Sequence, residues 1–293
     1  MSEFIFRELL TNSLEEADVL VYGLPFDKAT SVKSGAALAP SVLRNLSSFL
    51  PPVSYGGDVI KVKIKDFGDC DDFLSEKTDL AIKNLYSHKL FTLFLGGDHS
   101  VSIKTQKEFI NAYSGKKIGI IHCDAHADIC DIYDDNKLSH ACVNRRAVDS
   151  GISDNDIVYI GIRSWEMQEI EYFNKFSDIM VHPMISIHEK GLDCVIKEVV
   201  KKFKNYDAIY LSFDIDCVDP SSAPGTGTPE AGGMSSYNAM KMVKSFVEEL
   251  NVVTLDMVEV SPPLDSNDIT SWTALKIIYE AINQIALKKE KKC

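Results

Sequence analysis

The sequence lacks the features that mark several classes of protein. Its seven cysteines are scattered among 293 residues without a Cys-x-x-Cys pair, which argues against a disulfide framework and favours reduced thiols. No apolar run approaches the roughly 18 residues that a membrane span needs. The N-terminus is acidic and mixed, unlike a signal peptide. We therefore expect a cytoplasmic protein that has no membrane partner.

Positive charge is scarce as well. The chain carries 31 Lys and Arg against 43 Asp and Glu, a formal net charge of −12 with histidine neutral. Phosphate groups bind to a basic face, so we expect no nucleic-acid partner. An acidic cleft would instead attract a small cationic substrate.

Low-complexity segments and internal repeats are also missing, so we interpret residues 1–293 as a single domain. Apolar runs of strand length alternate with segments of helix length, which predicts an α/β protein with a mostly parallel sheet and helices on both faces. The run at 59–65 alternates Val or Ile with Lys, as is typical of an edge strand. We expect strands at 18–23, 59–65, 91–95, 117–122, 157–160, 178–181, 208–213 and 252–258. We expect helices at 71–88, 100–113, 190–204, 235–250 and 269–287.

Polar residues follow three of the predicted strands, at the edge where open parallel sheets bind ligands. Asp, His and Asp stand at alternate positions after 117–122, so in an extended segment they point to one spot. Four carboxylates and two imidazoles gathered there would repel one another unless divalent cations bound them. A donor set rich in oxygen and free of thiolate suits two Mn²⁺ ions. The predicted ligands are His99, Asp124, His126, Asp128, Asp214 and Asp216.

Residues interleaved with these ligands are expected to play other parts. Cys123, Cys130 and Cys217 stand at odd offsets from the ligands, so we predict that they face away as small core residues. His122 is also expected to face away from Asp124, either in the core or in support of a ligand.

Five motifs follow one another along the chain, namely Gly23-Leu-Pro-Phe-Asp27, Gly96-Gly-Asp-His-Ser100, Asp124-Ala-His-Ala-Asp128, Ser212-Phe-Asp-Ile-Asp-Cys-Val-Asp-Pro220 and Val258-Glu-Val-Ser-Pro-Pro263. Together they resemble the motifs of the ureohydrolase family, which includes arginases and agmatinases. The resemblance implies an arginase-like, three-layer α/β/α fold around an eight-stranded sheet, two Mn²⁺ ions per subunit, and a homo-oligomer, either a trimer or a hexamer. It covers nearly the whole chain.

The resemblance also divides the six ligands between two ions that share two carboxylates. The more buried ion would be bound by His99, Asp124, Asp128 and Asp214. The other ion would be bound by Asp124, His126, Asp214 and Asp216.

Three residues would take catalytic or substrate-binding roles by the same resemblance. Glu259 would bind the guanidinium group of the substrate. Asp128 would accept a proton from the attacking hydroxide and pass it to the leaving amine, and His140 would be a mobile histidine that exchanges protons with water. Glu259 could instead form a structural salt bridge with Arg163.

Several details favour the agmatinase branch, including Ser139-His140-Ala141 and Gly161-Ile-Arg-Ser164. Arginases usually carry an Asn at the position of Cys130 and an acidic pair where this chain has Trp165-Glu166, so the α-carboxylate of arginine lacks its expected partners. The expected reaction is hydrolysis of agmatine to putrescine and urea, a step of polyamine biosynthesis. The alternatives are another guanidino substrate (guanidinobutyrate, guanidine or arginine) or a catalytically silent relative that acts as a binding protein. The presence of all six ligands argues against the silent relative.

Overall fold

The computed structural model describes residue 6 and residues 8–291. Its strands form one eight-stranded sheet in the order β2-β1-β3-β8-β7-β4-β5-β6, and every strand pair in it is parallel. The strands are β1 (Val19–Gly23), β2 (Ile64–Asp69), β3 (Phe91–Leu95), β4 (Ile118–Cys123), β5 (Ile157–Ile160), β6 (Met180–His182), β7 (Ala208–Asp214) and β8 (Val252–Val258).

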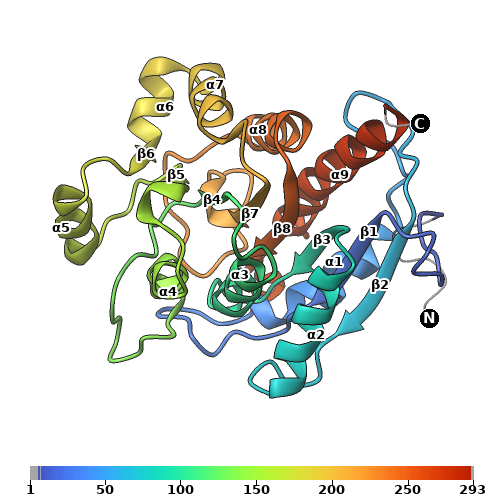
Figure 1. Cartoon of the computed structure of the whole chain (residues 1–293), viewed down its shortest axis with the longest axis horizontal. Coiled ribbons are helices and arrows are strands. Elements are labelled where there is room, and N and C mark those ends of the chain that lie inside the picture. The colour runs from blue at the N-terminus through green and yellow to red at the C-terminus, as the bar shows by residue number, and fades with distance from the viewer. Residues whose placement is uncertain (1–5, 7, 292–293) are drawn as a thin grey trace.

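Helices cover both faces of the sheet, which gives the three layers that the resemblance implies. In Figure 1, α8 and α9 lie on one side of the central strands, and α2 and α3 lie on the other. The described helices are α1 (Ala39–Ser47), α2 (Glu76–Ser87), α3 (Val101–Ala112), α4 (Val143–Asp149), α5 (Met167–Lys175), α6 (Met184–Lys190), α7 (Leu192–Phe203), α8 (Ser236–Glu249) and α9 (Ile269–Glu290). None of them combines the length and apolar character that a bilayer crossing requires.

Two apolar clusters hold these layers together. Alternate residues of β1 belong to different clusters, because successive side chains of a strand point to opposite faces. Val19 and Val21 belong to the cluster that includes residues of α7, α8 and α9. Leu20 and Tyr22 belong to the cluster that includes residues of α2 and α3. The sheet is therefore buried on both faces, as parallel sheets usually are.

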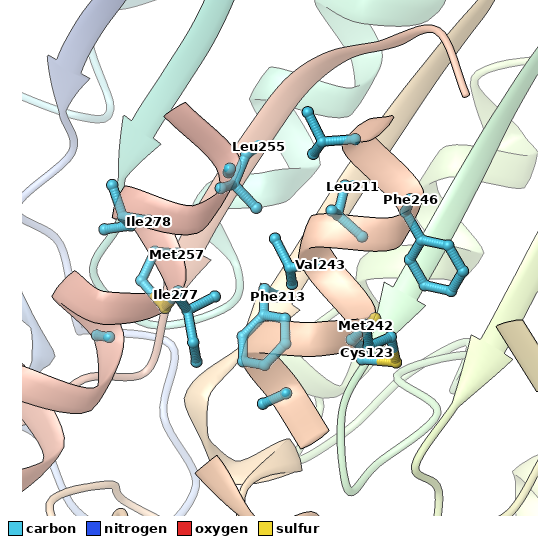
Figure 2. Close-up of a cluster of buried hydrophobic side chains, with 14 of the residues drawn as sticks. Cys123, Leu211, Phe213, Met242, Val243, Phe246, Leu255, Met257, Ile277 and Ile278 are labelled. Carbon is cyan, nitrogen blue, oxygen red and sulfur yellow. The ribbon is translucent and has the colours of Figure 1, made fainter. Parts of the chain in front are cut away.

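The core beneath the central strands fixes the positions of their carboxyl ends. Figure 2 shows side chains of β7 and β8 packed against α8 and α9. Leu211 and Phe213 of β7 and Leu255 and Met257 of β8 are fully buried in this cluster. Asp214 directly follows Phe213 in β7, so packing of the strand sets the position of the carboxylate.

The edge strand differs in its bounds from the prediction. β2 lies at one edge of the sheet, as expected, but it spans Ile64–Asp69 rather than 59–65. The alternation of apolar and Lys residues at 59–65 comes mainly from residues outside a strand. Ile60 and Val62 precede β2, and their side chains are buried in a core cluster. The four helices α1, α4, α5 and α6, which have 7 to 9 residues each, were not predicted.

Candidate metal centre and active site

Four adjacent strands deliver polar residues to one edge of the sheet. β3, β8, β7 and β4 are consecutive neighbours in the strand order, and because they are parallel, their carboxyl ends lie side by side. His99 follows β3, Asp124 follows β4, Asp214 ends β7 and Glu259 follows β8. The carboxyl edge of the sheet therefore gathers the residues that the sequence singled out.

His99 is the centre of the first ligand group. Its Nδ1 atom lies 3.0 Å from Asp124 Oδ2, 3.1 Å from Asp128 Oδ2 and 3.2 Å from Asp214 Oδ2. All four residues are buried. Three carboxylates therefore converge on one imidazole nitrogen in the interior.

His126 is the centre of the second group. Its Nδ1 atom lies 3.1 Å from Asp216 Oδ2 and 3.4 Å from Asp124 Oδ1. Asp124 thus presents one carboxylate oxygen to each histidine. The structure brings all six predicted ligands together, with Asp214 beside His99.

These residues fit a pair of divalent cations. Within the described residues, His99 Nδ1 and Asp124 Oδ2 are buried without a hydrogen-bond partner, and buried polar atoms rarely stay unpaired. Burial and the Asp216 and Asp124 carboxylates raise the pKa of Asp214, because like charges in the interior disfavour ionisation. A bound cation would satisfy the unpaired atoms and offset the repulsion. Carboxylate and imidazole donors without thiolate suit Mn²⁺.

A chain of buried hydrogen bonds orients the His99 ring. His99 Nε2 lies 2.9 Å from Ser212 Oγ, and the Ser212 hydroxyl donates to Asp256 Oδ1 at 2.9 Å. Because a hydroxyl has one proton to give, Ser212 must accept from His99, which places the imidazole proton on Nε2. The Nδ1 lone pair is then free to face the carboxylates. Neither role was predicted, because serine is not a typical metal ligand and Asp256 lies within β8 rather than after it.

His122 contradicts its predicted orientation. Its Nε2 atom lies 3.2 Å from Asp124 Oδ2 and 3.0 Å from the His126 carbonyl oxygen, and its ring stacks on His99 with centroids 5.0 Å apart. An offset of two residues from Asp124 keeps His122 on the same side of the strand, so the expectation that it faces away was wrong. Cys123 behaves as predicted and lies in the apolar core (Figure 2).

Arg163 is not the partner of Glu259, so the alternative of a structural salt bridge between them is wrong. The Arg163 guanidinium donates to the carbonyl oxygens of Asp216 at 2.6 Å and Glu230 at 2.7 Å. It also donates to the Ala231 carbonyl at 3.2 Å. Arg163 therefore ties the turn that carries a ligand, η4 (Ile215–Cys217), to the segment around residue 230.

Glu259 pairs instead with His140. Glu259 Oε1 accepts the backbone N–H of His99 at 2.8 Å and lies 3.1 Å from His140 Nδ1. Burial lowers the pKa of His140, but the hydrogen bond and charge of Glu259 outweigh burial and raise that pKa to about 9. Glu259 and Asp128 both have left-handed backbones, with φ of 60° and 51°, a strain that clusters at functional sites.

A pocket opens above the ligand groups. Four ligands reach it, namely His126, Asp128, Asp214 and Asp216. Its outer wall includes the two aromatic residues Tyr133 and Trp165 and the carboxylates of Glu166 and Glu230, and His140 also lines it. Tyr133 donates to Glu166 Oε1 at 3.3 Å, and Ser164 donates to Glu230 Oε1 at 3.1 Å. The site thus combines a buried metal-ligand cluster with an acidic entrance.

The fold and this cluster define the class of protein: an α/β protein that can bind metal ions at the carboxyl edge of a parallel sheet. The model of the arginase family matches residues 17–283. An agmatinase from Chromobacterium violaceum is 33% identical over 98% of this chain and 88% of the relative. A guanidinobutyrase from Pseudomonas aeruginosa is 32% identical over 92% of this chain and 86% of the relative.

Solved structures give the same result. A hypothetical agmatinase from Burkholderia thailandensis superposes with a TM-score of 0.84 at 32% identity, covering 98% of this chain and 92% of that one. The chain belongs to the arginase family of ureohydrolases, as its motifs predict.

Proposed function

We propose that the protein is a binuclear manganese hydrolase that cleaves the guanidino C–N bond of agmatine, so that agmatine and water yield putrescine and urea. The observation that carries the proposal is a set of six convergent metal ligands, four of which reach a pocket that His140 and the acidic entrance also line. His140 pairs in turn with the buried Glu259. Two divalent ions at the ligand groups would lower the pKa of a water molecule and so supply the nucleophile.

The residues of the chain would bind and orient the guanidinium. Glu259 is buried. A carboxylate binds a guanidinium well, because the planar cation can form two parallel hydrogen bonds with it. A guanidinium that pairs with Glu259 would replace His140 as its partner, which frees the imidazole to exchange protons. When the planar carbon of the guanidinium is held over the ligand groups, substrate and nucleophile react within one complex, which lowers the entropic part of the barrier.

Proton transfer would fall to Asp128 and His140. Asp128 lines the pocket together with His126, Asp214 and Asp216, so its carboxylate can accept the proton of the attacking water and pass it to the leaving amine. His140 lies at the same pocket with 13% of its side chain exposed. It is therefore placed to exchange that proton with solvent.

The charge of the entrance supports a substrate with a cationic tail. Glu166 and Glu230 line the outer wall, and no Lys or Arg belongs to the described lining of this pocket. Arg163 is committed to backbone carbonyl oxygens. The ammonium group of agmatine would find carboxylates there, whereas the carboxylate of guanidinobutyrate would meet charges of its own sign.

A substrate panel tests this proposal. Metal-stripped protein is reloaded with Mn²⁺, and urea or the matching amide product is measured from agmatine, guanidinobutyrate, arginine, formiminoglutamate and guanidine. We expect the highest kcat/KM with agmatine and no turnover by the stripped protein. A preference for guanidinobutyrate would contradict only the argument from the charge of the pocket entrance. Metal loading without turnover of any compound would support the silent binding protein.

We also propose a homo-oligomer, a trimer or hexamer, that works in the cytoplasm. The support is the family resemblance, and light scattering on the purified chain measures the assembly.

A further inference from the structure

A serine on the loop after β1 is the outer partner of His140. Ser31 Oγ lies 3.0 Å from His140 Nε2, and the Ser31 backbone nitrogen lies 3.2 Å from the same ring nitrogen, to which its N–H donates when that ring nitrogen carries no proton. The other ring nitrogen, Nδ1, is taken by Glu259 at 3.1 Å. Both nitrogens of the imidazole are therefore engaged, one by a buried carboxylate and one by Ser31.

The loop is held in place by contacts around Ser31. The Ala29 N–H donates to Asp98 Oδ2 at 2.8 Å, and the His140 N–H donates to the Ala29 carbonyl at 3.2 Å. Asp27 Oδ2 accepts the Gly35 N–H at 2.7 Å, which closes the base of the loop. The contact between Ser31 and His140 thus forms part of a bonded frame.

Solvent reaches the two residues differently. Ser31 is exposed, while only 13% of the His140 side chain is accessible. The charged groups that act on His140 are the carboxylates of Glu259, Asp128 and Asp98, and all three are buried. Nε2 therefore faces solvent through Ser31, and Nδ1 faces the interior.

The hydroxyl suits both protonation states of the ring. When Nε2 carries a proton, it can donate to Ser31 Oγ, and when Nε2 is bare, it can accept from the Ser31 hydroxyl or N–H. Alanine would keep only the backbone donor, which serves the bare nitrogen alone. A hydroxyl that donates and accepts by rotation can also pass a proton along a hydrogen-bonded chain.

We propose that Ser31 is a positioning residue for His140 and the first step of its proton path to solvent. Nε2–H gives its proton to Ser31 Oγ while the Ser31 hydroxyl gives its own proton to a water molecule, so the serine ends unchanged. This inference rests on the proposed function, because it assumes that His140 exchanges protons during turnover. If Ser31 acts in this way, the loop after β1 is one of the segments that determine the rate of turnover.

Substitution of Ser31 on the Mn²⁺-loaded enzyme tests the proposal. With agmatine, Ser31→Ala should lower kcat about tenfold, less than the roughly 10²-fold that loss of a whole proton-transfer group costs. KM and bound Mn²⁺ should stay within about twofold of the wild type, because the described hydrogen bond of the Ser31 side chain goes to His140 and not to Glu259 or a metal ligand. Ser31→Thr keeps the hydroxyl and should restore most of kcat. The ratio of kcat in H₂O to kcat in D₂O should rise in Ser31→Ala only.

Ser34→Ala is the matched control, because Ser34 is an exposed serine of the same loop and should leave kcat unchanged. A Ser31→Ala enzyme that turns over as fast as the wild type would overturn the proton path. Equal losses in Ser31→Ala and Ser31→Thr would overturn it too, since they would show that only the fold of the loop matters. An inactive wild type, tested with every compound of the panel, would overturn the proposed function and the proton path together.

Discussion

His140 Nδ1 lies 3.1 Å from Glu259 Oε1, so the carboxylate assigned to the guanidinium already has a cationic partner. The two residues are 119 positions apart in the sequence and meet because one follows β8 and the other begins η2 (His140–Cys142). A substrate cation must compete with the imidazolium for this carboxylate. Histidine movement and substrate binding are therefore coupled in the proposed mechanism.

The first prediction concerns the pKa of His140. Glu259→Gln removes the negative charge, and burial alone lowers the pKa of a histidine. We expect an NMR titration of the labelled ring to show the pKa falling from about 9 to its ordinary value of 6.5 or lower. Since the folded pKa lies above the ordinary value, the pair stabilises the fold fully below about pH 6.5 and loses this contribution as pH rises through about 9. An unchanged titration in Glu259→Gln would show that another group holds the proton.

The second prediction concerns the shared ligand. Asp124→Ala should reduce bound Mn²⁺ from two ions per chain to fewer than one, because Asp124 contacts both histidine groups. His126→Ala should keep one ion, bound around His99. Metal analysis after gel filtration measures both. Asp135→Asn is a suitable control, since Asp135 is exposed and its left-handed φ of 57° suits asparagine. Equal metal loss from Asp124→Ala and His126→Ala would contradict the proposal that Asp124 is a ligand of both ions.

The third prediction concerns the acidic entrance. Glu166→Gln should raise KM for agmatine about fivefold, since an exposed ion pair contributes up to about 1 kcal/mol. It should leave kcat nearly unchanged, because the role proposed for Glu166 is to bind the tail of the substrate and not the reacting guanidinium. The difference in KM between the variant and the wild type should shrink at high salt. KM values at low and high ionic strength measure the effect, and identical values for wild type and variant would remove Glu166 from the binding of the tail.

The fourth prediction concerns Arg163, which braces a ligand turn. Lysine offers a point charge rather than a planar fork, so Arg163→Lys should lower the free energy of unfolding by about 2 kcal/mol and weaken Mn²⁺ binding through the turn that carries Asp216. Urea denaturation and metal titration measure the two effects. Arg145→Lys serves as the control, because Arg145 makes partly exposed ion pairs with Asp131 and Asp149, which contribute little, and its guanidinium lies 5.6 Å from the Tyr172 ring centroid, where a lysine can keep a cation. A similar change in both variants would contradict a special role for Arg163.

Much of the fold and the ligand set could be predicted from sequence because their signals are local. Strand-length runs such as Phe91–Leu95 match the structure residue for residue, and alternate spacing placed Asp124, His126 and Asp128 together. Short helices such as α6 were missed because seven residues contain too few turns for a clear periodic pattern.

The supporting residues could not be predicted because their partners are distant in sequence. Ser31 meets His140 across 109 positions, and Ser212 meets His99 across 113 positions. No local pattern distinguishes such a serine from one on the surface. The wrong prediction for His122 has a different origin. The two-residue period of a strand was sufficient to place His122 on the same side as Asp124.

The most direct test of the central claim is the rate of urea release from agmatine as Mn²⁺ is added stepwise to chelator-treated protein. Two ligand groups that share Asp124 predict no urea without metal and a rate that rises until two ions are bound per chain. A rate independent of Mn²⁺, or no urea at full loading, would contradict the account.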